Sequence, residues 1–195
     1  QQFAIIDSDK KALLKSASQQ YDYLGDVVAL NTYLSFHNHG EGYQNEQDYF
    51  ANEYFRYVDW NNPNYNYMSW VYEAMRSYAS TVSLFRFPDE VHKNLLTGLL
   101  ENMPASSRTK QLALAGIISG LKSRKHANMP HFAQLFVDTY QASEPIAAKA
   151  LEKDLAAAKA FIIGAEAPDF EQKTPNGEVV QLSDLRGQVV LVDFW

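Results

Sequence analysis

Three side chains at alternate positions, His37, His39 and Glu41 in the stretch HNHGEG, come nearest in this sequence to a set of metal ligands. In an extended loop, alternate side chains point the same way, and imidazole and carboxylate groups both bind zinc. Ligands this close along the chain are hard to wrap around one ion, and no fourth ligand is marked. We therefore expect a polar helix end with solvated histidines there, and no metal site.

Other patterns that carry catalytic chemistry are missing from the sequence. It contains no cysteine, which excludes disulfides, thiol catalysis and cysteine metal sites within these residues. No G-x-S-x-G, H-E-x-x-H or P-loop pattern occurs. Ser, His and Asp are present, but no spacing indicates a triad. The residues by themselves therefore predict neither a metal nor a cofactor.

The stretch between Tyr43 and Tyr72 is rich in tyrosine and tryptophan. Aromatic residues at helical spacing most often belong to a core, and Phe50 and Phe55 suit that interpretation. Each tyrosine must keep its hydroxyl hydrated or hydrogen-bonded, which is easier on a half-exposed surface. Two alternatives stay open, a structural role and a binding surface for a peptide, a sugar or a protein partner. The candidate surface residues are Tyr54, Tyr57, Trp60, Tyr65, Tyr67 and Trp70.

Composition limits the class of protein. The 195 residues are 46% hydrophobic and 21% charged, as in ordinary globular proteins. The net charge is −6, and lysine and arginine are scattered along the chain. A nucleic-acid binder needs a basic face that displaces counterions from phosphate, so we expect no nucleic-acid partner. No uninterrupted apolar run is long enough to span a membrane.

The elements that would position any site are helices over residues 1 to about 160. Apolar residues recur at helical spacing, and prolines and glycines mark the breaks. No fixed period or solenoid signature is present, so the pattern predicts a bundle or array of helical hairpins. The expected helices cover about residues 22–36, 44–58, 65–85, 88–103, 108–122, 130–140 and 144–161.

The pattern changes at Gly164 and becomes typical of β structure. Pro175, Asn176 and Gly177 form a hairpin turn signal between two extended stretches. The chain then reaches VVLVDFW, residues 189–195, in which apolar residues fall on both faces of a strand. We expect a central, buried strand there.

The residues after Gly164 resemble a known family. APDF at 167–170, the Asn-Gly turn, LSDLRG at 182–187 and VDFW at 192–195 occur in the order and spacing of secreted thiol-disulfide oxidoreductases of the TlpA/ResA type, within the AhpC/TSA-like superfamily. Peroxiredoxins share APDF and LSDLRG but usually continue with Phe or Tyr and then Pro, where this chain has Phe194-Trp195. The resemblance covers residues 164–195 only.

The resemblance implies a specific chemistry. In this family the strand ending in Asp-Phe-Trp leads into a Cys-x-x-Cys loop, with the first cysteine about four residues later. Asp193 would be the buried proton acceptor during dithiol–disulfide exchange, and burial would raise its pKa. Trp195 and Phe194 would pack near the cysteine loop, and Pro168 would begin the hairpin. A strand-edge Asp193 facing solvent is the structural alternative.

These observations predict a mainly α protein in two parts. A helical domain, residues 1–163, precedes the first β-hairpin and strand of an incomplete α/β thioredoxin-like domain, residues 164–195. We expect the N-terminal portion of an exported thiol-disulfide oxidoreductase. The resemblance implies a periplasmic or membrane-surface location, and a protein thiol or disulfide substrate or redox partner. Two further possibilities stay open: that the longer parent protein is anchored to a membrane, and that it forms a homodimer. The alternative function is a helical binding or assembly module with an aromatic-rich surface.

Overall fold

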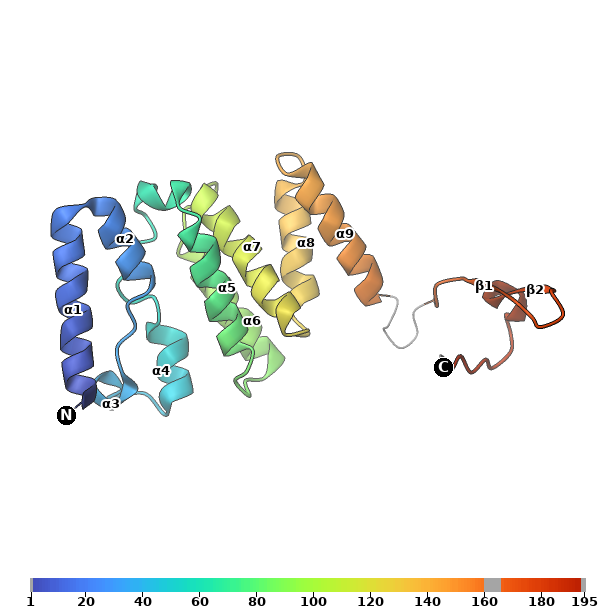
Figure 1. Ribbon diagram of the computed structural model, residues 1–195, viewed down its shortest axis with the longest axis horizontal. Helices are drawn as coiled ribbons and strands as arrows, with labels where there is room; N and C mark the ends of the chain where they lie inside the picture. Colours follow the sequence, from blue (N-terminus) through green and yellow to red (C-terminus); the bar gives the residue numbers. More distant parts are fainter. Residues whose placement is uncertain (1, 160–165, 194–195) are drawn as a thin grey trace. The chain divides into compact units, whose positions relative to one another are not determined.

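The structure is a computed structural model that describes residues 2–159 and 166–193. It divides into two compact units, Gln1–Glu152 and Lys153–Trp195. The boundary expected between residues 163 and 164 lies outside the described residues. The mainly α class is confirmed: Figure 1 shows helices followed by a small two-stranded hairpin. The thioredoxin-like assignment of that hairpin stays a prediction.

The helical unit is built from short and medium helices, most of them close to the expected ranges. They are α1 (Gln2–Gln20), α2 (Asp22–Leu30), α3 (Phe36–His39), α4 (Glu46–Glu53), the 3-10 helix η1 (Pro63–Tyr67), α5 (Trp70–Val82), α6 (Asp89–Glu101), α7 (Arg108–Ser123), α8 (Met129–Tyr140) and α9 (Pro145–Lys159). The last of these, α9, runs across the division between the units.

Three expected helices are shorter in the structure: the one expected over 44–58 ends at Glu53, and polar side chains or proline end or delay the other two. The helix expected over 22–36 stops at Leu30. There the Asn31 amide and the Thr32 hydroxyl donate to the carbonyls of Val27 and Val28 at 2.8 and 2.7 Å. Such side-chain bonds compete with helix continuation. The helix expected from residue 65 begins only at Trp70, after the 3-10 turn that starts at Pro63.

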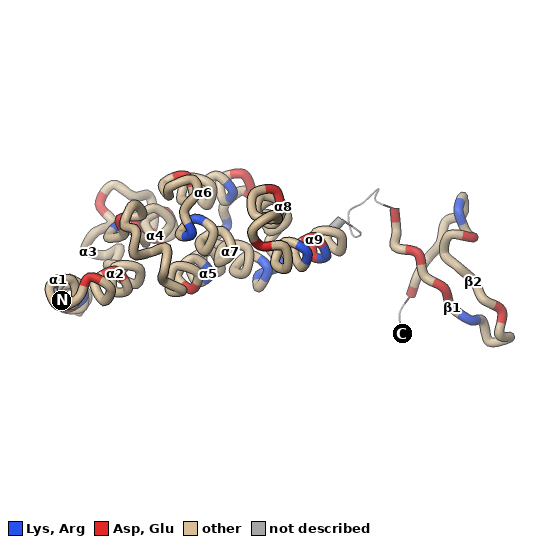
Figure 2. Tube along the Cα trace, turned by 90° about the horizontal axis from the view of Figure 1, so that it is seen from above, with Lys and Arg blue, Asp and Glu red and all other residues tan. Residues whose placement is uncertain are grey.

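The helices of this unit form two layers. Figure 2 shows α4 and α6 in one layer, and α1, α2, α5 and α7 in the other. Among the described elements, α5 and α7 pack together most extensively. Their backbones approach closely at two glycines of α7. A Cβ atom on Gly120 would lie 2.6 Å from the Arg76 carbonyl oxygen, and one on Gly116 would meet the Tyr72 carbonyl oxygen.

Aromatic rings fill the space between the α4 region and α5. Phe50 stacks on Tyr78 at a centroid distance of 5.8 Å, and Phe55 contacts Tyr78 at 5.1 Å. The Tyr78 hydroxyl donates to the Ala51 carbonyl at 2.5 Å, so its polar end is satisfied in the core. The structural interpretation of Phe50 and Phe55 is therefore confirmed.

The first helix, α1, contributes few buried residues to its packing against the rest of the helical unit. Only Asp7 and Ala17 of this helix are buried, whereas Phe3, Ile5, Ile6 and Leu13 are exposed. The Asp7 carboxylate fixes the chain before α3 by accepting from the Ser35 N–H, the Ser35 hydroxyl and the Asn38 amide at 2.9, 2.6 and 2.7 Å. Over the described ranges, no helix combines the length and the apolar character that a membrane span requires.

The C-terminal unit contains an antiparallel hairpin of β1 (Glu171–Lys173) and β2 (Val179–Gln181), followed by the 3-10 helix η2 (Leu182–Leu185). Glu171 pairs with Gln181 and Lys173 pairs with Val179. Gly177 in the turn has a φ of +85°, which a glycine adopts without strain. The hairpin predicted from Asn176-Gly177 is therefore present.

The buried strand predicted over 189–195 is not formed in the described part of that segment. Residues 189–193 have no strand pairing. Val189 and Leu191 are 104% and 93% exposed, and Val190 and Val192 are about two-fifths exposed. A strand needs a neighbour for its backbone hydrogen bonds, and β1 and β2 pair only with each other among the described residues. Phe194 and Trp195 lie outside them.

Candidate functional site

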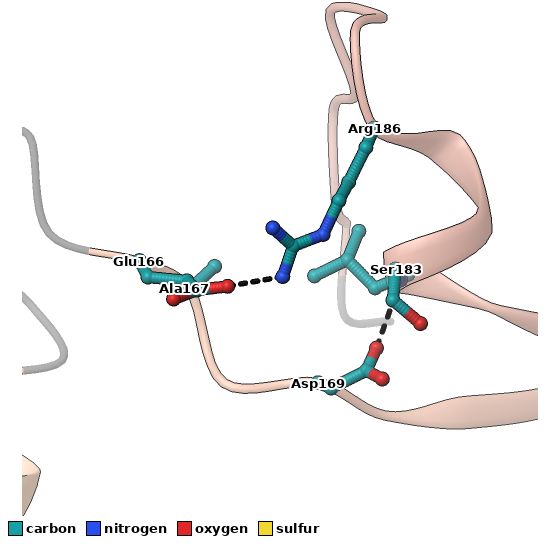
Figure 3. A pocket seen from close by; sticks show the side chains of 6 residues that line it. Glu166, Ala167, Asp169, Ser183 and Arg186 are labelled. Atoms are coloured by element: carbon teal, nitrogen blue, oxygen red, sulfur yellow. Dashed lines mark hydrogen bonds and ion pairs between the residues drawn. The ribbon is translucent and has the colours of Figure 1, made fainter.

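The residues of the family motifs form a shallow cavity of about 520 Å³ in the C-terminal unit. Figure 3 shows that the segment before β1 provides one side and the η2 region the other. The lining consists of Glu166, Ala167, Asp169, Leu182, Ser183 and Arg186.

Two polar contacts cross this cavity (Figure 3). The Ser183 N–H donates to the Asp169 carboxylate at 2.9 Å, and the Arg186 guanidinium pairs with Glu166. Hydrogen bonds from the side chain and backbone of Ser183 lower the pKa of Asp169. An exposed ion pair contributes little to stability. These contacts join the segment before β1 to the η2 region.

The predicted redox residues lie near this hairpin but are not assembled into a site. Asp193 and Pro168 are exposed. Trp195 and Phe194 lie outside the described residues. The burial expected for Asp193 is therefore not observed, because no described strand or helix covers residues 189–193.

The candidate aromatic surface separates into core and exposed residues. Trp60 and Tyr65 are 7% and 1% exposed, so they belong to the core and not to a surface. Their rings pack together at 5.8 Å, and Trp60 also meets Phe55 edge-on at 5.2 Å. This corrects the interpretation of these two residues, which tertiary packing places inside.

The other members of the candidate aromatic surface are at least partly accessible. Tyr54 and Tyr57 are half-buried. Tyr54 packs on Phe50 with a centroid distance of 4.8 Å. Tyr67 and Trp70 are 87% and 47% exposed and lie where η1 leads into α5. A binding surface made of the predicted residues is thus limited to this end of α5.

The HNHGEG segment has a structural role in the fold. His39 lies 3.7 Å from the Asp7 carboxylate through its Nε2 atom. Burial raises the pKa of Asp7, but the hydrogen bonds from Ser35 and Asn38 together outweigh it and bring the pKa down to about 2. No group of three metal-ligating side chains is gathered in the described ranges 2–159 and 166–193.

A second pair of histidines in the helical unit combines the buried His92 with the partly exposed His126. The rings of His92 and His126 stack at a centroid distance of 4.0 Å. Burial, and then the neighbouring His126, lower the pKa of His92 to about 4. The His92 Nδ1 atom faces the Asn128 amide at 3.3 Å, and its Nε2 atom has no hydrogen-bond partner. The ring stack joins α6, which carries His92, to the turn before α8, which carries His126.

Between the α4 region and α6 lies a groove that we call the amide groove. It consists of two adjoining cavities of about 380 and 430 Å³, both lined by Asn52, Leu99 and Asn102. Asn61 lines the first cavity and Asn94 the second. Four uncharged side-chain amides, each able to donate and accept hydrogen bonds, therefore line the groove, beside Arg56, Asp59 and Glu101.

Sequence reasoning did not identify the amide groove, although part of it has a sequence signal. Asn94, Gly98 and Asn102 follow one another at intervals of four, which places them on one face of a helix. Asn52 and Asn61 come from a different part of the chain, and only the tertiary structure brings them to the same groove.

Comparison with known proteins gives no relative. No protein-family model matches the chain, and neither a curated protein nor a solved structure is detectably similar to it.

Proposed function

We propose that this chain is the N-terminal portion of an exported thiol-disulfide oxidoreductase. The supporting observation is that three of the four family-like motifs occupy one hairpin and the turn that follows it. APDF precedes β1, the Asn-Gly turn joins β1 to β2, and LSDLRG forms η2 and the turn after it. Asp169 and Ser183, from the first and third motifs, are hydrogen-bonded. The first and third motifs are thus in contact in the fold.

The proposed reaction is dithiol–disulfide exchange. A thiolate attacks one sulfur of the substrate disulfide, the other sulfur leaves as a thiolate, and a mixed disulfide forms. A second cysteine then attacks this intermediate, so the enzyme dithiol is oxidised as the substrate is reduced. Asp193 would accept the proton of that second thiol. This role requires β-strands and helices that bury Asp193, which is exposed among the described residues.

The test is made on the parent protein that carries the residues after Trp195. A Cys-x-x-Cys pair within the next several residues supports the proposal, and a loop without cysteines contradicts it. In an insulin-reduction assay, replacing either cysteine by serine should abolish turnover. Asp193→Asn should slow turnover by about 10²-fold, while Asp184→Asn, an exposed carboxylate of η2, should leave it unchanged. An Asp193→Asn protein with full activity would remove Asp193 from the mechanism.

The extracytoplasmic location is part of the same proposal and rests on the resemblance alone. The partner would be a protein thiol or disulfide. Separating membrane and soluble fractions of cells that make the parent protein, with a periplasmic extract as third fraction, tests this location. Recovery in the cytoplasmic fraction would contradict it.

A second candidate function is a helical binding module, which the exposed rings of Tyr67 and Trp70 favour. They lie three residues apart at the junction of η1 and α5, and no described ring packs against either. Exposed aromatic side chains are enriched in protein interfaces. If the parent lacks the cysteine pair, this function replaces the redox one. Tyr67→Ala and Trp70→Ala should then weaken partner capture while leaving the fold intact.

A further inference from the structure

The amide groove lies wholly within the helical unit and is separate from the hairpin that carries the redox proposal. Residues of α4 and of the turns after it form one wall, and α6 forms the other. Figure 2 shows these two elements in the same layer, above α5. Asn52, Asn94 and Asn102 are exposed, so solvent reaches the groove along its length.

The amides in this groove have unused hydrogen-bonding capacity. Among the described residues, the side chains of Asn94 and Asn102 make no hydrogen bond to protein. The Nδ2 atom of Asn52 donates to the Asp48 backbone carbonyl at 2.8 Å, which leaves its Oδ1 atom as an acceptor. A primary amide donates and accepts at the same time, as a peptide group does. The walls of the groove therefore match a peptide backbone.

The spacing of these groups suits an extended chain. Asn94 and Asn102 are eight positions apart, which is about 12 Å along a helix axis. An extended peptide advances about 3.3 Å per residue, so this separation equals about four residues. Both asparagines could thus contact backbone groups of a single bound segment.

The floor of the groove distinguishes a peptide from a sugar. Leu99 lies at the junction of the two cavities, beside Phe55 and Trp60. Phe55 and Trp60 are 9% and 7% exposed, so little of either ring reaches the groove. A sugar ring would need an open aromatic face to stack on, which these rings do not offer, whereas an apolar side chain of a peptide needs only an apolar floor.

The charges at the groove are mainly acidic. Glu101 lines one cavity and has no ion pair among the described residues. Asp59 lines the other cavity. Arg56 also lines it, but its guanidinium pairs with Glu53 at 3.1 Å. Charge complementarity therefore favours a ligand with a lysine or arginine side chain.

We propose that the amide groove binds an extended polypeptide segment of about four residues, with an apolar side chain on Leu99 and a basic side chain near Glu101. This inference does not rest on the redox proposal, because no thiol takes part. An unfolded or flexible protein segment is the class of partner.

Gly98 provides a way to block the groove without disturbing the helix. It lines the cavity beside Asn94 and Asn102, and a Cβ atom built on it has no neighbour within 4 Å. A larger side chain at this position therefore projects into the groove and not into the core. Replacing glycine inside a helix also favours the helix. Gly98→Leu should fill the groove, and Gly98→Ala should leave most of it open.

The probe is ribonuclease A that has been reduced and capped with iodoacetamide, an unfolded basic chain without free thiols. Its binding to the full 195-residue chain is measured by fluorescence anisotropy, with folded ribonuclease A for comparison. We expect binding of the unfolded probe only. Gly98→Leu and the double variant Asn94→Ala/Asn102→Ala should each weaken it at least 10-fold. Gly98→Ala and Gln19→Ala, which removes an exposed amide on α1, should change it less than 2-fold.

Three results would overturn the proposal. The first is an unmodified chain that does not bind the unfolded probe, or binds the folded protein equally well. The second is Gly98→Leu and the double asparagine variant binding as tightly as the unmodified chain. The third is displacement of the probe by maltohexaose, which would assign the groove to sugars. Thermal unfolding of each variant checks the fold. Asn94 and Asn102 are exposed, so their replacement should leave the fold intact. The double variant therefore still tests binding in the groove if Gly98→Leu is unstable.

Discussion

The helical unit and the C-terminal unit use their apolar residues in opposite ways. Leu30, Leu96 and Ile117 in the helical unit are 0% exposed, whereas Val189 and Leu191 near the other end are almost fully exposed. The helical unit is held by a core, and the hairpin by backbone pairing, a glycine turn and the Asp169–Ser183 contact. The recognisable motifs therefore lie in the unit with fewer buried residues, and the unit with the buried core carries none of them.

The largest expected effect concerns the close approach of α5 and α7. Gly120→Leu places a side chain where even a Cβ atom would lie 2.6 Å from the Arg76 carbonyl oxygen. The two helices must separate, and the free energy of unfolding should fall by about 3–5 kcal/mol. Gly98→Ala is the matched control and should raise it by about 1 kcal/mol. Urea titrations followed by circular dichroism measure both, and equal stability of the two variants would contradict the packing argument.

A smaller effect is expected at Asp7, which joins α1 to the rest of the helical unit. Asp7→Ala leaves the Ser35 N–H and the Asn38 amide without their acceptor and should cost about 2 kcal/mol at pH 7. Because the folded pKa is about 2 and lies below the ordinary value, the stabilisation is present above pH 4 and is lost as the pH falls towards 2. Asp9→Ala, at an exposed site on α1, should change little. A cost that persisted unchanged at pH 2 would disprove the ionic origin.

The next effect concerns the buried His92. Its folded pKa of about 4 lies below the ordinary value of 6.5, so between these values the unfolded chain binds a proton that the folded chain does not. Stability should therefore fall by about 1–2 kcal/mol between pH 7 and pH 5. His92→Leu should remove this pH dependence, whereas His131→Gln, on α8, should keep it. Denaturant titrations at pH 7 and pH 5 measure the free energy of unfolding. If His92→Leu lost as much stability between these pH values as the unmodified chain, His92 would be excluded as the source.

The smallest effect is expected in the C-terminal unit, where the exposed apolar residues should contribute little to stability. Val189→Thr and Leu191→Thr replace side chains that are almost fully exposed. The free energy of unfolding should change by less than about 0.5 kcal/mol. Leu96→Ala, in the buried face of α6, is the contrasting control and should cost about 2–5 kcal/mol. A large loss from either threonine variant would show that residues 189–193 are packed in solution.

The sequence predicted the presence and order of most helices, but not every residue at which they begin and end. Helices α6, α7 and α8 were placed within about two residues, because their apolar periodicity and end signals agree. The end of α2 at Leu30 was missed, because it depends on hydrogen bonds from Asn31 and Thr32 to the preceding turn. The hairpin turn was predicted correctly from Asn176 and Gly177, since turn chemistry is local.

The sites were less predictable than the fold. Trp60 and Tyr65 were placed on a surface because aromatic spacing does not reveal which face a residue presents, and packing against Phe55 buries Trp60. The amide groove brings together Asn52 of α4 and Asn102 at the end of α6, and one sequence does not record that proximity. The buried Asp7 likewise depends on Ser35 and Asn38, about thirty positions away.

The close packing of α5 and α7 also determines the order in which the helices unfold locally. Amide protons at the centre of a helical array exchange with solvent only when large parts of it unfold, whereas terminal helices open locally. The amides of Gly116 and Gly120 should therefore be among the last to take up deuterium. Within the helical unit, the amides of α1, where only Asp7 and Ala17 are buried, should exchange earlier. The helical unit would then open from its N-terminal helix inward, with the glycine contact as its most persistent part.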